Sequence, residues 1–224
     1  MKKFGDSAFE FLKGLKPDFK LPDGISCLLP FEDAQVVSIN KIFYKKFYDD
    51  KVKRKMILGI NPGRFGSGIT GISFTDPIKL ESELGIKNTF SKRAELSSDF
   101  VYKVISDIGG PEKFYSRFYL SAVCPIGFVK NSKNFNYYDD KVLTESIYQF
   151  IIRSIELQLT FGIDRSICFC LGEGDNFKFL NHLNNQHHFF EKIIPLAHPR
   201  FIMQYRRKFL SDFVKSYITA LNSN

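Results

Sequence analysis

The sequence predicts an α/β protein with three α/β/α layers, in which a central four-stranded parallel sheet lies between helices. Four short apolar runs carry this prediction: "KMILGI" (55–60), "FYLSAV" (118–123), "SICFCL" (166–171) and "FEKIIPL" (190–196). At least the first three are nearly continuously apolar, as strands buried on both faces are. Segments with helical periodicity separate the runs, and strands that alternate with helices form parallel sheets covered on both sides.

The first fifty residues are predicted to form a helical segment packed on the rest of the domain. The N-terminal stretch "MKKFGDSAFEFLKGLK" has charges spaced through it and no apolar core of signal-peptide length, so it is expected to be a short amphipathic helix. Residues 32–49 are predicted to form a second helix, closed by the polar turn "DDKVKRK". Because no repeat, low-complexity tract or linker divides the chain, residues 1–224 are expected to form one domain, with 1–50 packed on it.

Helical periodicity predicts the remaining helices in order. They are expected at residues 93–108, 139–161, 175–183 and 200–222. The second has an apolar stripe that includes Leu143, Ile147 and Ile151, and the last has one that includes Leu210, Val214 and Tyr217.

Composition limits the classes of function. A chain of 224 residues can bury a full core, and no run approaches the length of a membrane span. The sequence is therefore interpreted as cytosolic, without a membrane partner. The net charge of +8 favours a polyanionic partner such as nucleic acid, or serves only solubility.

The four cysteines indicate structural thiols rather than a metal centre. Cys27, Cys124, Cys168 and Cys170 include no C-x-x-C pair and no zinc spacing, and the last two alternate as same-face residues of a strand do. We expect no metal and no cofactor.

Two polar residues follow predicted strands directly. Asn61 comes after the first strand, and His198 comes after the fourth, in "LAHPRF". In open parallel sheets, ligands bind outside the carboxyl ends of the strands. These two distant residues are therefore expected to face one crevice.

The stretch "LGINPGRFGSGITGISFTDP" (58–77) is a glycine-rich turn of a different kind from the phosphate loops. It lacks the Gly-Lys-Ser/Thr of a Walker A loop and the G-x-G-x-x-G of a dinucleotide fingerprint. A plain strand-to-loop turn would not need four glycines and an Asn-Pro pair. The backbone is therefore expected to approach a ligand closely.

Two motifs together resemble the uracil-DNA glycosylase superfamily. "GINPGRFGSGITGISF" is similar to its first motif, in particular to the G-M-N-P-G-P-F-G pattern of the single-strand-selective monofunctional branch, and "HPR" (198–200) is similar to a shortened second motif, H-P-S-P-R. The mismatch-specific branch carries Asn instead of His in the second motif, so His198 favours the single-strand-selective branch. The resemblance implies a uracil-DNA glycosylase-like fold and a bacterial relative of that branch.

The resemblance also implies a reaction and roles for the residues that match. The N-glycosidic bond between a damaged base and deoxyribose is cleaved, Asn61 positions the attacking water, and neutral His198 donates a hydrogen bond to the departing base. The turn that includes Ile60, Gly63 and Phe65 is expected to contact the base.

Phe74 lies where the family's base-stacking aromatic lies, although core packing is the alternative. Gly63 stands where the family's uracil-specific enzymes carry a bulky Tyr, so that room for larger bases is implied. Asp76 either assists the water or caps a helix.

The resemblance breaks at the second strand, where the family has a base-reading Asn. This sequence has Ser121 or Ala122 there. Asn134 and Asn136, in the loop that follows, either supply a replacement amide or are turn residues.

Basic residues follow the second motif and are expected to bind DNA. The expected DNA-binding residues are Arg200, Phe201, Arg206, Arg207 and Lys208. Arg200 or Phe201 would fill the stack that an extruded base leaves, and the other side chains would contact phosphates. The alternative is a solvated helix face. A second basic run, Lys45 to Lys55, either adds to this surface or is a solvated turn.

The predicted function is a monofunctional DNA glycosylase that removes uracil or related deaminated or modified bases in base excision repair. It is expected to be a monomer in the bacterial cytoplasm, at the nucleoid. Neither motif places a Lys as a Schiff-base nucleophile, so no lyase step is expected. The alternatives are a catalytically weak nucleic-acid-binding module with the same fold and a nucleoside or nucleotide hydrolase, against which the basic segment argues.

Overall fold

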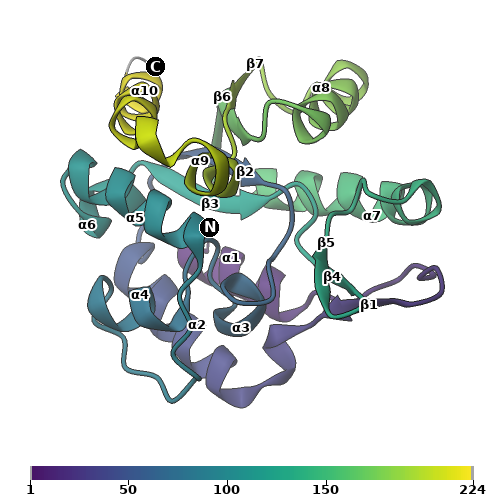
Figure 1. The fold of residues 1–224 in the computed structure, drawn as a ribbon, viewed down its shortest axis with the longest axis horizontal. Coiled ribbons are helices and arrows are strands. Elements are labelled where there is room, and N and C mark those ends of the chain that lie inside the picture. The colour runs from purple at the N-terminus through teal and green to yellow at the C-terminus, as the bar shows by residue number, and fades with distance from the viewer. Residues whose placement is uncertain (1, 223–224) are drawn as a thin grey trace.

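The computed structural model describes residues 2–222, so residues 1, 223 and 224 of the expected domain lie outside it. The main sheet has four strands with all neighbours parallel, as the sequence predicts, and its strand order is β3-β2-β6-β7 (Figure 1). These strands are β2 (Arg54–Gly59), β3 (Phe118–Ala122), β6 (Ile163–Leu171) and β7 (Lys192–Leu196). Each overlaps one of the four apolar runs.

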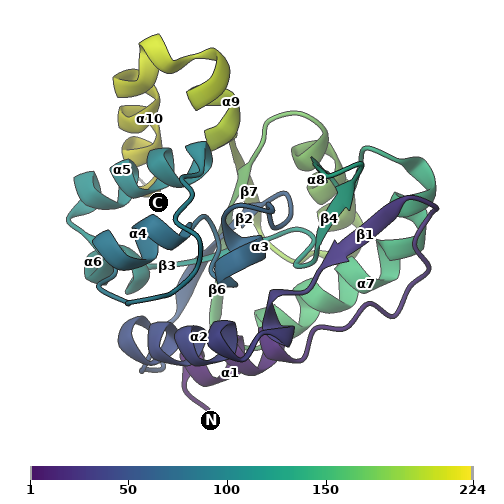
Figure 2. The same ribbon diagram turned by 60° about the horizontal axis from the view of Figure 1, so that its bottom comes forward.

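Helices cover both faces of this sheet. They are α5 (Leu96–Ile108), α10 (Leu210–Asn222), α7 (Lys141–Leu159) and α8 (Asp175–His187). In Figure 2, α5 and α10 lie on one side of the sheet, and α7 and α8 lie on the other. Strand side chains alternate accordingly, since Ile57 and Leu171 line a small cavity with Val104 of α5, whereas the thiol of Cys170 contacts Asn176 of α8. The predicted three-layer architecture is confirmed.

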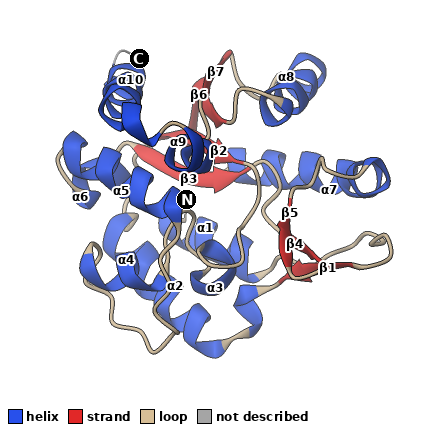
Figure 3. Ribbon diagram, viewed as in Figure 1, coloured by secondary structure: helices blue, strands red, loops and turns tan. Residues whose placement is uncertain are grey.

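The N-terminal segment contains the two expected helices and a strand that was not expected. The helices are α1 (Phe4–Lys13) and α2 (Ala34–Phe47), and Asp33 caps α2 by accepting a hydrogen bond from the Gln35 N–H at 2.7 Å. Between them, β1 (Ile25–Leu28) pairs with β4 (Gly127–Lys130), which pairs in turn with β5 (Lys133–Phe135). This second, antiparallel sheet lies beside the main one (Figure 3). Its strands are too short to leave a clear alternation in the sequence.

Four short helical segments add to the predicted elements. They are η1 (Pro30–Glu32), α3 (Ser67–Thr70), α4 (Pro77–Ser82) and α6 (Pro111–Tyr115), of which α4 begins at the helix start left open after Asp76. Three of them begin at a proline, whose fixed φ suits the first helical turn.

The single C-terminal helix predicted at residues 200–222 is wrong. The segment forms α9 (Pro199–Tyr205), a 3₁₀ turn η2 (Arg207–Phe209) and α10. Arg206 adopts φ −130° and ψ 19°, which interrupts the helix between α9 and η2. The basic residues 206–208 therefore lie at a corner and not along one helix face.

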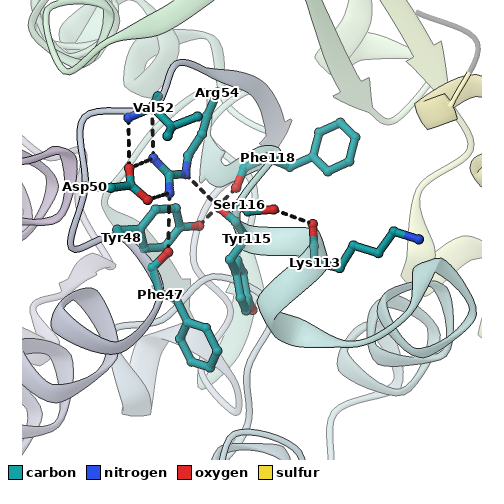
Figure 4. Close-up of polar contacts among 9 residues, drawn as sticks. All are labelled: Phe47, Tyr48, Asp50, Val52, Arg54, Lys113, Tyr115, Ser116 and Phe118. Carbon is teal, nitrogen blue, oxygen red and sulfur yellow. Dashed lines mark hydrogen bonds and ion pairs between the residues drawn. The ribbon is translucent and has the colours of Figure 1, made fainter.

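Part of the basic run from Lys45 to Lys55 is internal. The guanidinium of Arg54 is fully buried, where it makes two 2.8 Å contacts with the Asp50 carboxylate and donates to the carbonyl of Tyr115 at 2.7 Å (Figure 4). It also lies over the rings of Phe4 and Tyr48. Arg54 thus fixes α1 to the start of β2, and it is not available to DNA.

The cysteines are consistent with structural roles. Cys124, Cys168 and Cys170 are buried, Cys27 is half-buried, and burial raises the pKa of each thiol. Across residues 2–222, no three His, Cys, Asp or Glu side chains are grouped to hold a metal ion. In the same part of the chain, no helix has the length and apolar character needed to cross a membrane.

Candidate base-binding site

A pocket of about 300 Å³ lies at the carboxyl ends of β2 and β3. It brings together residues that the sequence separates widely, because parallel strands end at the same edge of the sheet. The predicted site residues that line it are Ile60, Asn61, Gly63, Phe74, Ser121, Asn136, His198, Arg200 and Phe201. Asn61 and His198 therefore face one crevice, as expected. Phe65, Asp76, Arg206, Arg207 and Lys208 do not line this pocket.

The amide of Asn61 is held by backbone groups at the end of β5 and in the loop that follows it. Its Nδ2 donates to the carbonyl of Phe135 at 3.2 Å, and its Oδ1 accepts from the N–H of Tyr137 at 3.1 Å. These two bonds fix which way the amide faces. They leave the second lone pair of Oδ1 for a water or a ligand.

The side chain of His198 caps α9 and also lines the pocket. Its Nδ1 accepts a hydrogen bond from the N–H of Arg200 at 3.2 Å. Burial of the imidazole, with a smaller contribution from the Arg200 charge, lowers the pKa of His198 to about 4. The ring is therefore neutral at pH 7 with its proton on Nε2, which makes that nitrogen a donor.

Phe74 packs on the end of β2 in a strained conformation. Its φ is +54°, in the left-handed region that non-glycine residues seldom adopt. A Cβ added to Gly59 would lie 2.8 Å from Cζ of the Phe74 ring, so only a glycine allows the ring to lie this close. The ring centroid is 6.2 Å from that of His198. This arrangement places the aromatic ring in the pocket wall beside the imidazole.

The space beside Gly63 is filled, which corrects the expectation of free room there. A Cβ on Gly63 would lie 2.8 Å from Oε1 of Glu95, and a Cβ on Gly66 would overlap Oε2 of the same carboxyl. Two of the motif glycines thus make room for Glu95, a pocket-lining residue that no sequence pattern singles out. It lies in "KRAELSS", which matches no motif.

Asp76 takes the second of the two roles left open for it. Its Oδ1 accepts from the N–H groups of Ile78 and Lys79 at 2.9 Å each, which caps α4, and its Oδ2 accepts from the N–H of Glu95 at 3.0 Å. The side chain is fully buried beneath the pocket. Its negative charge raises the pKa of Glu95, and its side chain does not line the pocket.

The end of β3 offers little for reading a base. The Ser121 hydroxyl donates to Oε1 of Gln158 at 2.6 Å, so its donor is occupied within the core. Of the two loop amides, Asn136 donates to Asp139 at 3.2 Å, whereas Asn134 uses only Oδ1, which accepts from the N–H of Arg64 at 3.0 Å. The Nδ2 group of Asn134 lies near Gly63. Both amides line the pocket, and Asn134 has the freer donor.

Exposed aromatic and basic side chains border the pocket on α9. Phe201 is 42% exposed and Tyr205 is 61% exposed, and their rings lie 5.8 Å apart. The guanidinium of Arg206 lies 5.4 Å from the Phe201 ring. An exposed aromatic pair beside cations suits contact with unstacked bases and phosphates.

Phe65 lies outside the base pocket, in contrast to the expectation. The guanidinium groups of Arg64 and Arg93 both lie over its ring, at 4.3 and 3.8 Å from the centroid. It lines a neighbouring cavity of about 360 Å³ together with Lys133 and Arg200. This cavity is strongly basic and adjoins the pocket at Glu95.

Comparisons with known proteins agree with this geometry. A family model described as the uracil DNA glycosylase superfamily matches residues 45–222. A crystal structure of wild-type SMUG2 from Pedobacter heparinus is 46% identical in sequence, aligns over 100% of this chain and 98% of that chain, and superposes with a TM-score of 0.97. No curated protein sequence matches the chain.

Proposed function

This chain belongs to the uracil DNA glycosylase superfamily and is a DNA glycosylase, a hydrolase of N-glycosyl bonds, and from that premise we propose that it removes uracil and related deaminated or modified bases from DNA. The observation that carries the proposal is the meeting of Asn61, Phe74 and His198 at one pocket. The SMUG-like relationship expected from the two motifs is confirmed.

In the proposed mechanism, Asn61 orients the attacking water. Its amide is fixed by backbone groups of Phe135 and Tyr137, and the free lone pair of Oδ1 accepts a hydrogen bond from the water. An amide is a weak base. The water is therefore captured after the glycosidic bond has largely broken, when the sugar carries positive charge.

His198 stabilises the departing base. The leaving base gathers negative charge on its ring oxygens, and a donor aimed at that charge lowers the barrier. The neutral imidazole with its proton on Nε2 supplies such a donor without giving up a proton. Phe74 supplies a face on which the base stacks, and the 300 Å³ pocket has room for one base.

The reaction is proposed to end with the abasic site, without strand cleavage. A lyase step needs an amine nucleophile at the sugar, and the described residues that line the base pocket include no lysine. The guanidinium of Arg200, which lines this pocket, does not form Schiff bases.

DNA is proposed to lie across α9 and the corner that follows it. Arg200, Arg206, Arg207 and Lys208 would contact phosphates, and Phe201 would fill the vacated stack. We propose a monomer that acts in the bacterial cytoplasm at the nucleoid, with no cofactor or metal.

The test uses oligonucleotides that carry one uracil, hypoxanthine, xanthine or 5-hydroxymethyluracil, in single and double strands. After incubation with the protein, alkali cleaves abasic sites and the products are separated by length. Cleavage only after alkali supports the proposal. Tight binding without abasic sites would favour a non-catalytic binding module, and release of bases from free nucleosides alone would favour a nucleoside hydrolase.

A further inference from the structure

Much of the hydrogen-bonding capacity of the pocket is used within the protein. The Ser121 hydroxyl is bound to Gln158, the Asn61 amide is bound to the loop backbone, and Asn136 is bound to Asp139. Two groups beside Gly63 keep capacity for a ligand, namely the carboxyl of Glu95 and Nδ2 of Asn134. Glu95 and Asn134 are therefore the candidates to replace the base-reading Asn that the family carries at the end of β3.

Glu95 has an unusual position for an acidic residue at the start of a helix. It is the residue that precedes α5, where a short acidic side chain would cap the helix, but its carboxyl accepts no bond from the helix N–H groups. The carboxyl lies instead across the glycine turn, against Gly63 and Gly66. The backbone is thus shaped to admit this carboxyl at the pocket wall.

Among residues 2–222, no basic side chain forms a direct ion pair with the Glu95 carboxyl. Asp76 lies beneath it, Arg200 lies on α9, and Arg64 and Lys133 line the adjoining cavity. Burial and the Asp76 charge raise the pKa of Glu95 to about 7, against the opposing effects of the Ser97 hydroxyl and Arg200. Both the protonated and the ionised forms are therefore populated near neutral pH.

We propose that Glu95 is a specificity-determining residue, whose protonated carboxyl donates a hydrogen bond to a carbonyl oxygen or ring nitrogen on the edge of the extruded base. This inference rests on the proposed function and names a further contact of the same pocket. Asn134 supplies a second donor from its free Nδ2 on the same wall.

The direction of the effect follows from charge. The departing base becomes negative, and an ionised carboxylate at the wall repels it, whereas a protonated carboxyl binds it. The hydrogen stays on Glu95 throughout, so no proton is transferred. Base excision is then fastest while Glu95 is protonated and slows as Glu95 ionises.

The test is single-turnover excision of uracil from an oligonucleotide between pH 5.5 and 8.5. The wild-type rate is expected to fall above about pH 7, approaching tenfold per pH unit because one proton is lost. Glu95→Gln keeps a donor at every pH, so its rate should stay near the wild-type plateau and be flat across the range. Glu95→Ala removes the donor and should be roughly tenfold or more slower at pH 6. Glu145→Gln, on an exposed face of α7, is the matched control and should keep the wild-type profile.

Three results would overturn the inference. The first is a wild-type pH break that persists in Glu95→Gln, and the second is a wild-type rate in Glu95→Ala. The third is a rate that rises with pH and is lost in Glu95→Gln, which would make Glu95 a general base. Circular dichroism and thermal midpoints of each variant separate misfolding from lost contact. Failure of the proposed function is distinct, because the wild-type protein would then excise none of the bases at any pH.

Discussion

The Nδ1 atom of His198 accepts a hydrogen bond from the N–H of Arg200, so the first residue of the second motif caps the helix that contains its last residue. This bond sets the tautomer of the imidazole, because Nδ1 cannot both accept and carry the proton. The proposed function of His198 as a donor at Nε2 thus depends on the backbone of its own helix.

We expect His198→Ala to slow uracil excision by roughly 10- to 150-fold, the value of one hydrogen bond to a charged group. Easily departing bases need less help, so the penalty should be smaller for 5-fluorouracil. Because the pKa of His198 is lowered to about 4, the ring stays neutral above about pH 5. Titration of His198 should therefore cause no change in the wild-type rate near pH 6.5. Single-turnover rates plotted against leaving-group acidity test this. A penalty that is constant across the bases would mean that His198 has only its capping role.

Asn61→Ala should reduce excision by about 100- to 1,000-fold, since it removes a group that acts in the transition state. Unlike the penalty at His198, this one should vary little with the base, because Asn61 acts on the side of the water. DNA affinity, measured by fluorescence anisotropy, should stay close to wild type. A loss of rate below tenfold would contradict the assignment.

Charge reversal at Arg206 and Arg207 should weaken DNA binding more than it slows the chemistry. Each phosphate contact contributes about 0.9 to the slope of log affinity against log salt on duplex DNA, so the double variant should lose up to about 1.8. The control is Lys141→Glu with Lys178→Glu, two exposed lysines on α7 and α8. If both double variants change the slope equally, the DNA does not lie at the corner after α9.

Gly59→Ala should impair excision through Phe74. The added Cβ would lie 2.8 Å from Cζ of the ring, so the aromatic face must move. A misplacement of about 1 Å at a reacting group costs up to about 100-fold in rate. The rate is measured under single turnover, and the thermal midpoint of the variant shows how much of the effect is unfolding. A variant with the wild-type rate would show that Phe74 packs in the wall without stacking on the base.

Glu95→Gln should stabilise the fold in a pH-dependent way. The folded-state pKa of Glu95 is raised from 4.5 to about 7, so the favourable contribution of its proton is present below about pH 4.5 and is lost as the pH rises through 7. The variant has no such loss, and its advantage over wild type should therefore grow by about 1–3 kcal/mol between pH 5 and pH 8. Urea unfolding at both pH values measures this. An advantage that does not depend on pH would mean that the carboxyl has an ordinary pKa in the folded protein.

The main sheet could be predicted because at least three of its strands contain nearly continuous apolar runs, and the motif residues could be placed because each follows a strand directly. The contacts of Glu95 could not be predicted. Its partners, Gly63, Gly66 and Asp76, come from other segments, and no spacing rule joins them. The break at Arg206 was missed for a similar reason, since the apolar stripe of α10 continues the helical period across a residue whose backbone is not helical.

The strand β5 was missed as well, although it shapes the site. Its last residue is Phe135, whose carbonyl holds the Asn61 amide. Sequence patterns detect elements with a long regular period, and a three-residue strand has none. Such a strand forms because its neighbour is already in place.

The second sheet makes the orientation of the Asn61 amide dependent on residues that carry no motif. β1 is hydrogen-bonded to β4, β4 to β5, and β5 ends at the carbonyl that orients Asn61. A version of the protein trimmed by its first thirty residues would keep both motifs and all four strands of the main sheet. It would lose β1, the outer strand that pairs with β4, so a shortened protein must retain β1 to keep this support for Asn61.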